Sequence, residues 1–154
     1  MGCKGLSLLE LVVALAIISV LLVLVVPAYR NTLDNNEQQV LIDTIYNAVQ
    51  YSKHQAIQLG YPLYLLPIRA KKGWSDGLLL SKDKKQNSMS ILNEWTFLHR
   101  NWSLKWKGVD SNTCITISNS PMHAMSNGTF VLENQITHEK VVLLLNRLGR
   151  LKRA

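Results

Sequence analysis

Near the N-terminus, the residue that could do chemistry is Glu10, a carboxylate within an apolar run. From Leu6 to Val26 it is the only charge, and the other residues are apolar except Ser7 and Ser19. The run matches the ~20 residues that an α-helix needs to cross a bilayer. A charge at the centre of such a helix costs roughly 2.5–3.5 kcal/mol, and less near its end. Glu10 is therefore a candidate functional residue that needs a partner.

The C-terminus is a second candidate site, because basic residues cluster there without acidic ones. The last nine residues include Arg147, Arg150, Lys152 and Arg153. Such side chains neutralise phosphates and release counterions, which gives an affinity that depends on salt and not on base sequence. A solvated basic tail without a ligand is the alternative, and the residues leave both interpretations open.

The remaining polar residues form no pattern typical of an active site. No His, Cys, Asp and Glu residues have metal-ligand spacing, and there is no phosphate loop or Gly-x-Ser-x-Gly motif. The four histidines are scattered: His54, His99, His123 and His138. We therefore expect no catalytic residue, no metal and no cofactor. The net charge of +7 instead favours anionic partners such as nucleic acid, phospholipid headgroups or acidic proteins.

Apolar periodicity predicts a long helix, in which residues 6–26 span a membrane and residues 27–59 are amphipathic. The stripe in the second half has three- and four-residue steps: Leu41, Ile45, Ala48, Ser52, Ala56 and Leu59, widened by Ile42, Tyr46 and Val49. Pro27 is expected to kink or interrupt the helix. Lys4 before the span, with no basic residue after it until Arg30, places the N-terminus in the cytoplasm and the following domain outside.

Residues 60–154 contain short apolar segments separated by turn residues, which predicts an antiparallel sheet or sandwich. Strands are expected at 61–66, 77–81, 89–92, 102–106, 114–118, 129–133 and 140–146. Trp74–Gly77 is expected to be a turn. The fold class predicted from the whole chain is α+β.

Gly5, the segment Leu6–Leu11, the apolar run and Pro27 together resemble the N-terminus of a type IV pilin or pseudopilin precursor. The resemblance implies that residues 1–5 are a leader, that a prepilin peptidase cuts after Gly5, and that Leu6 is then N-methylated. Glu10 would become the fifth mature residue, where that superfamily keeps a glutamate. In a filament, Glu10 could pair with the ammonium at Leu6 of a neighbouring subunit. Leu6 is a departure, since the family more often begins with Phe.

Later segments resemble the GspH/FimT branch of this superfamily, which comprises the minor pseudopilin H of type II secretion and a related minor type IV pilin. The matching segments are Ala48–Ile57, Gly73–Gly77, Ser126–Phe130 and Val142–Arg150. The resemblance implies a long N-terminal helix that carries a two-sheet β-sandwich head. It also implies a single-pass protein of the bacterial inner membrane with its head in the periplasm. This protein would later assemble with other subunits into a pilus or pseudopilus.

Gly149-Arg150-Leu151-Lys152 resembles the terminal Gly-Arg-x-Arg motif by which some minor pilins of this family bind DNA. Lys152 replaces the second arginine, and a lysine keeps the charge but loses the bidentate fork. We therefore predict a minor pilin that contributes to DNA uptake in natural transformation. Its candidate contacts to double-stranded DNA are Arg147, Gly149, Arg150, Lys152 and Arg153. The alternative is a minor pseudopilin H, which acts in protein export through the outer membrane.

Overall fold

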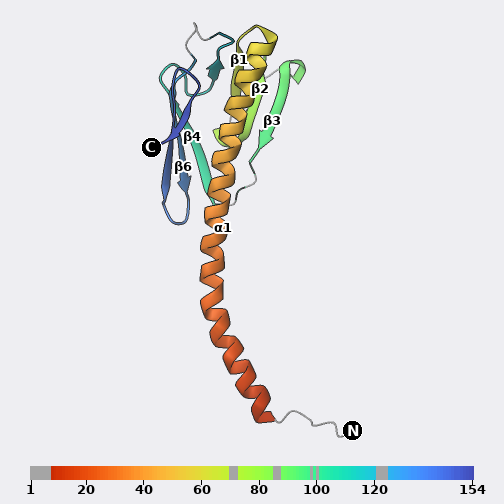
Figure 1. Ribbon diagram of the computed structural model, residues 1–154, viewed down its shortest axis with the longest axis vertical. Coiled ribbons are helices and arrows are strands. Elements are labelled where there is room, and N and C mark those ends of the chain that lie inside the picture. Colours follow the sequence, from red (N-terminus) through yellow and green to blue (C-terminus); the bar gives the residue numbers. More distant parts are fainter. Residues whose placement is uncertain (1–7, 70–72, 85–87, 98, 100, 121–124) are drawn as a thin grey trace. The chain divides into compact units, whose positions relative to one another are not determined.

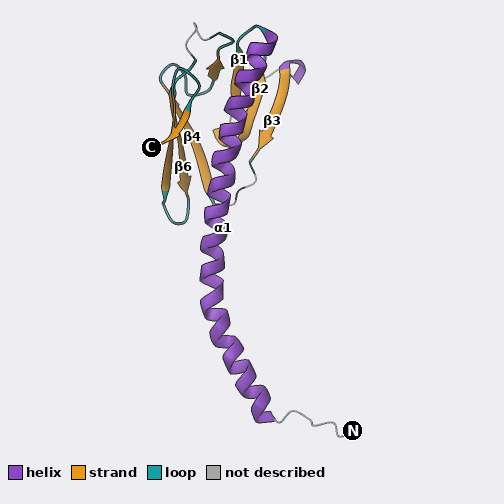
Figure 2. Ribbon diagram, viewed as in Figure 1, coloured by secondary structure: helices purple, strands orange, loops and turns teal. Residues whose placement is uncertain are grey.

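The computed structural model describes residues 8–69, 73–84, 88–97, 99, 101–120 and 125–154, and for residues 23–34 and 88 it describes the backbone alone. The chain divides into two compact units, Met1–Glu37 and Gln38–Ala154. The described part of the first unit is helical. The second unit contains the rest of the same helix and two four-stranded antiparallel sheets (Figure 1 and Figure 2). This architecture confirms the predicted α+β fold with an N-terminal helix and a two-sheet head.

The helix α1 (Leu8–Leu59) continues through Pro27, so the predicted alternative of a local interruption is wrong. A proline removes one N–H donor from the helical ladder, and the turns on either side of it can still form. The helix ends at Leu59, and the next residue, Gly60, has a φ of 75° and donates its N–H to the carbonyl oxygen of Ala56 at 3.0 Å. A left-handed glycine is a common way to terminate a helix.

Within Gln38–Ala154, α1 buries one stripe of side chains against the sheets. Its buried residues are Gln38, Leu41, Ile45, Ala48, Val49, Ser52 and Ala56. This spacing confirms the predicted amphipathic pattern. Tyr46 and Leu59 were wrongly assigned to the stripe, since both are exposed. Tyr46 lies one residue, and thus about 100° around the axis, from the buried Ile45, and Leu59 is the last residue of the helix.

The first sheet has the strand order β3-β2-β1-β5. Its strands are β1 (Leu63–Arg69), β2 (Gly73–Ser81), β3 (Ile91–Thr96) and β5 (Ile115–Ile117), and a short 3-10 helix, η1 (Ser88–Ser90), precedes β3. The predicted turn at Trp74–Gly77 is wrong, because these residues lie within β2. Gly77, with a φ of 141°, allows this pairing, since a Cβ there would overlap the carbonyl oxygen of Trp95.

The second sheet has the order β4-β6-β7-β8. Its strands are β4 (Trp102–Gly108), β6 (Gly128–Asn134), β7 (Lys140–Leu145) and β8 (Leu151–Arg153). Along β4, β6 and β7, buried residues alternate with more exposed ones, as expected for a sheet with one face in the core. The strand β8 was not predicted. It pairs with β7 so that Lys152 lies opposite Leu144 and Leu151 opposite Leu145.

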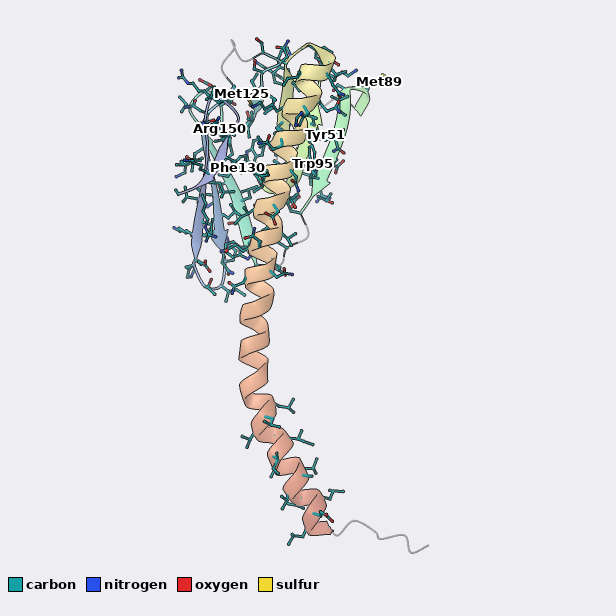
Figure 3. All side chains as sticks on the ribbon, in the orientation of Figure 1. Tyr51, Met89, Trp95, Met125, Phe130 and Arg150 are labelled. Atoms are coloured by element: carbon teal, nitrogen blue, oxygen red, sulfur yellow. The ribbon has the colours of Figure 1, made fainter. Side chains whose placement is uncertain are left out.

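Aromatic side chains fill the space between the two sheets. The ring of Phe130 lies 4.6 Å from that of Trp106 and 6.3 Å from that of Trp74, measured between centroids, and Figure 3 labels Phe130 on its strand. Both indole N–H groups are satisfied, since Trp74 donates to the carbonyl oxygen of Asn112 and Trp106 to that of Ser111, each at 2.9 Å. Burying a tryptophan with its N–H paired avoids the cost of an unsatisfied donor.

Candidate functional site

Glu10 lies in the first described turn of α1 with its side chain exposed. The apolar side chains around it are exposed too: Leu8 by 84%, Leu9 by 73% and Leu11 by 54%. Apolar surface of this extent normally marks contact with other protein or with lipid. Gly5 and Leu6, the predicted cleavage and methylation residues, lie outside the described residues. Among those that are described, no helix combines the length and the apolar character of a membrane span.

The predicted DNA-binding residues lie on the turn that joins β7 to β8 and on β8 itself. Asn146 organises this turn, because its side-chain Oδ1 accepts hydrogen bonds from the N–H groups of Leu148 at 3.0 Å and Arg150 at 2.8 Å. The N–H of Gly149 donates to the carbonyl oxygen of Asn146 at 3.0 Å, and Gly149 has a φ of 72°. An asparagine that bonds the backbone ahead of it is typical of tight turns.

Residues distant in sequence hold this turn in place. Lys53 donates from Nζ to the carbonyl oxygen of Leu148 at 3.0 Å, and Gln50 donates from Nε2 to that of Gly149 at 3.5 Å. Met125 donates its N–H to the carbonyl oxygen of Arg147 at 3.2 Å. A Cβ on Gly149 would lie 2.8 Å from Sδ of Met125, so the turn packs closely on its neighbours.

Four of the five predicted contact residues fall into two groups by the position of their side chains. Arg147 and Arg150 line a cavity beside the turn together with Lys53, and Figure 3 labels Arg150 and Met125 in this region. Lys152 lies on β8 opposite Leu144, on the outer face of its sheet, and Arg153 lies at the exposed end of the strand. Gly149 provides the backbone conformation of the turn and no side chain.

The outer face of the second sheet is basic. By strand register and burial, it presents four exposed lysines: Lys105, Lys107, Lys140 and Lys152. Lys107, Thr129, Leu144 and Lys152 form one continuous row across the four strands. Trp106, between Lys105 and Lys107 in sequence, points instead into the core and is 4% exposed. It therefore offers no ring on which a base could stack.

Glu133 is the carboxylate on this face. Its oxygens lie 3.2 Å from Nζ of Lys140 and 3.8 Å from Nζ of Lys105. The hydrogen bond from Lys140 lowers the pKa of Glu133, and the charges of Lys140 and Lys105 add to that shift. Glu133 stays ionised and neutralises part of the charge of two lysines, while Lys107 and Lys152 are outside these ion pairs.

Among the described residues, no three His, Cys, Asp or Glu side chains are placed so that they could hold a metal ion. His54 and His138 are exposed, and His123 lies outside the described residues. Nε2 of His99 is 2.7 Å from the carbonyl oxygen of Ser75 on β2.

Sequence reasoning missed Lys53 and Gln50 as part of the site around the turn. Both are polar residues of α1 that lie off the buried stripe, spaced three apart and thus on one face of the helix. That spacing marks a common face but does not show what it contacts. The contacts to the turn join residues 95 and 99 positions apart.

The helix and the two antiparallel sheets make up a pilin-like α+β fold. Residues 1–26 match the model of the prokaryotic N-terminal methylation motif. These findings confirm the resemblance to GspH/FimT-like minor pilins that the sequence indicates.

Solved structures of two such proteins are similar to this chain. The type IV minor pilin FimU of Pseudomonas aeruginosa (strain PAO1) aligns over 79% of this chain and 90% of its own, with 17% identity and a TM-score of 0.64. The minor pseudopilin EpsH from the type 2 secretion system of Vibrio cholerae aligns over 77% and 96%, with 15% identity and a TM-score of 0.53. At these identities the likeness concerns the fold. No curated protein gives a significant match.

Proposed function

We propose that this chain is a structural subunit of a pilus or pseudopilus, made as a precursor and stored in the membrane before assembly. The methylation motif over residues 1–26, followed by a minor pilin fold, supports this role above all. In this proposal residues 1–5 are the leader, a prepilin peptidase cuts after Gly5, and Leu6 becomes the methylated N-terminus. Residues 60–154 are the head, and the helix of residues 6–59 inserts among the helices of other subunits.

Glu10 guides assembly in this proposal. An exposed carboxylate surrounded by exposed leucines would lose its solvation when the helix enters a filament. The new ammonium at Leu6 of a neighbouring subunit would offset that cost, since a buried charge is tolerated when it is paired. Pro27 lies in the same helix and sets how its N-terminal part packs.

Before assembly, residues 6–26 anchor the chain in the bacterial inner membrane, with the N-terminus in the cytoplasm and the head in the periplasm. This placement rests on the sequence, in which Leu6–Val26 contains one charge and Lys4 precedes the run.

Processing can be tested by co-expressing the chain with a prepilin peptidase and measuring the mass of the product. We expect a mature chain that begins at Leu6 and carries one added methyl group. Gly5→Ile should remain uncut, whereas the matched change Gly2→Ile should be processed normally. A mature N-terminus at any other residue would contradict the proposal.

We further propose that the head binds DNA through its basic C-terminal residues, as in natural transformation. Support comes from the placement of Arg147 and Arg150 together on the β7–β8 turn, and from Lys152 on a sheet face with three other lysines. Phosphate contacts of this kind give affinity without base specificity.

Binding of a labelled duplex by the full chain in non-ionic detergent, measured across salt concentrations, tests this proposal. The double change Arg150→Gln and Lys152→Gln should lower the slope of log affinity against log salt by about 2 if each contacts a phosphate. Lys82→Gln with Lys84→Gln makes the same charge change on the β2–β3 loop and should have a smaller effect. Equal slopes for the two double variants would remove the assignment to the tail.

The alternative is a minor pseudopilin that acts in protein export through the outer membrane, and the similarity to EpsH favours it as a second candidate. Deleting the gene distinguishes the two. A secretion defect with normal DNA uptake supports the pseudopilin, and the reverse supports the pilus role.

A further inference from the structure

A cavity of about 250 Å³ lies between α1 and the β7–β8 turn, within the unit Gln38–Ala154. Three kinds of side chain line it. Three are cationic, Lys53, Arg147 and Arg150, three are apolar, Ile57, Met125 and Leu148, and two are the hydroxyl side chains of Ser118 and Ser120. Among the described residues that line it, none is acidic. The cavity therefore combines a positive wall with an apolar wall.

The cationic wall is positioned by the fold and remains able to bind an anion. Lys53 uses one N–H for the carbonyl oxygen of Leu148, and an ammonium group has three. The hydrogen bonds of Asn146 fix the backbone that carries Arg147 and Arg150. In the described part of the chain, no carboxylate forms an ion pair with any of these three cations. A phosphate would meet at least three donors from two elements.

The apolar wall indicates what is attached to the anion. Ile57 is 53% exposed and Leu148 is 59% exposed, although both border the same concave site. Inorganic phosphate would leave this apolar surface in water, whereas a sugar or base would cover part of it. The volume lies just below the ~300–1,000 Å³ of sites for drug-sized ligands. It suits one nucleotide and is too small for the acyl chains of a phospholipid.

We propose that this cavity is a subsite for one unpaired nucleotide of DNA. Its phosphate lies against Lys53, Arg147 and Arg150, and its sugar or base lies against Ile57, Met125 and Leu148. The inference rests on the proposed DNA binding and adds to it the form of DNA that is bound, a single strand or a frayed end. Bases within a duplex are paired and stacked, so only a single strand or a frayed end can place a base in the cavity.

The test compares single-stranded and duplex oligonucleotides of the same length, binding to the full chain in non-ionic detergent at one salt concentration. The duplex has the higher charge density, so electrostatics alone favours it. We expect the single strand to bind about fivefold more tightly, near the lower end of what one base contact contributes. Ile57→Gln and Leu148→Gln should abolish this preference without changing the charge. Ile136→Gln, at an exposed isoleucine that does not line the cavity, should keep it.

Two further measurements identify the ligand. Lys53→Gln should weaken single-strand binding and lower its salt slope by about 0.7, and Lys53→Arg should restore the slope. Thymidine monophosphate should displace the labelled strand at lower concentration than inorganic phosphate does.

The inference would be overturned if the duplex bound more tightly than the single strand and if Ile57→Gln and Leu148→Gln left both affinities unchanged. The proposed function would then remain in place. Displacement by phosphatidylglycerol vesicles but not by the nucleotide would also overturn it, in favour of a lipid. Failure of the parent chain to bind either form of DNA would remove both proposals.

Discussion

Nζ of Lys53 lies 3.0 Å from the carbonyl oxygen of Leu148, so the helix α1 holds the turn between the last two strands. This hydrogen bond brings a cation of the helix to the cavity that Arg147 and Arg150 also line. The basic C-terminus is therefore part of the folded head through residue 153, where β8 ends. A basic segment with a fixed backbone can present its charges in one geometry, which a solvated tail cannot.

Gly149→Ala should destabilise the head more than Gly60→Ala. Both glycines have a positive φ, 72° and 75°, so alanine costs about 1–2 kcal/mol at either position. A Cβ at Gly149 would also lie 2.8 Å from Sδ of Met125, whereas at Gly60 nothing lies within 4 Å. Urea denaturation, followed by tryptophan fluorescence, measures the difference. Equal losses of unfolding free energy in the two variants would show that the side chain of Met125 can move aside and that the turn is not closely packed.

Ser75→Ala should weaken the connection between the two sheets. Oγ of Ser75 on β2 donates to the carbonyl oxygen of Leu104 on β4 at 3.2 Å and accepts from its N–H at 2.9 Å. The change leaves an N–H at the sheet edge without this partner, which typically costs about 1–3 kcal/mol.

Ser103→Ala is the control for Ser75, because Oγ of Ser103 donates to the carbonyl oxygen of Glu133 within the same sheet. Ser103→Ala should lower the free energy of unfolding less than Ser75→Ala does. A larger loss for Ser103→Ala would refute the bridging role of Ser75.

The pKa of Glu133 should depend on Lys140 more than on Lys105. Lys140 lowers this pKa by a hydrogen bond at 3.2 Å, and Lys105 acts from 3.8 Å by charge alone. A pKa lowered by folding adds stability that is present above the unfolded value of about 4.3 and is lost as pH falls through the folded value. Lys140→Gln should raise the pKa and move this loss to higher pH.

Carbon-detected NMR titration of the Glu133 carboxyl measures the shift directly. Lys105→Gln should give a smaller rise than Lys140→Gln. The opposite order would mean that the ion pair with Lys105 is the stronger one.

The sequence predicted those features that repeat along the chain. The buried stripe from Leu41 to Ala56 follows a helical period, and the alternation in β4, β6 and β7 follows the period of a strand. Trp74–Gly77 was mistaken for a turn, because a serine, an aspartate and a glycine in succession are typical of turns. The glycine instead permits close pairing with β3, and only the fold reveals that neighbour.

The candidate site was predicted in part, for a similar reason. The cluster from Arg147 to Arg153 is visible in the sequence, but its division between a cavity and a sheet face depends on β8, which has three residues and no apolar alternation. Lys53 joins the site through a contact across 95 residues. Local patterns contain no information about a contact at that separation.

Incorporation of Glu10 variants into filaments tests whether the chain assembles through its N-terminal helix. The chain is expressed with its partner subunits, and its amounts in the membrane and in the sheared filament fraction are compared. Glu10→Ala and the isosteric Glu10→Gln should both remain in the membrane and be absent from filaments, because neither can pair with an ammonium. Asp43→Ala, which removes an exposed carboxylate elsewhere on α1, should enter filaments normally. Normal incorporation of Glu10→Ala would show that assembly does not depend on the Glu10 carboxylate.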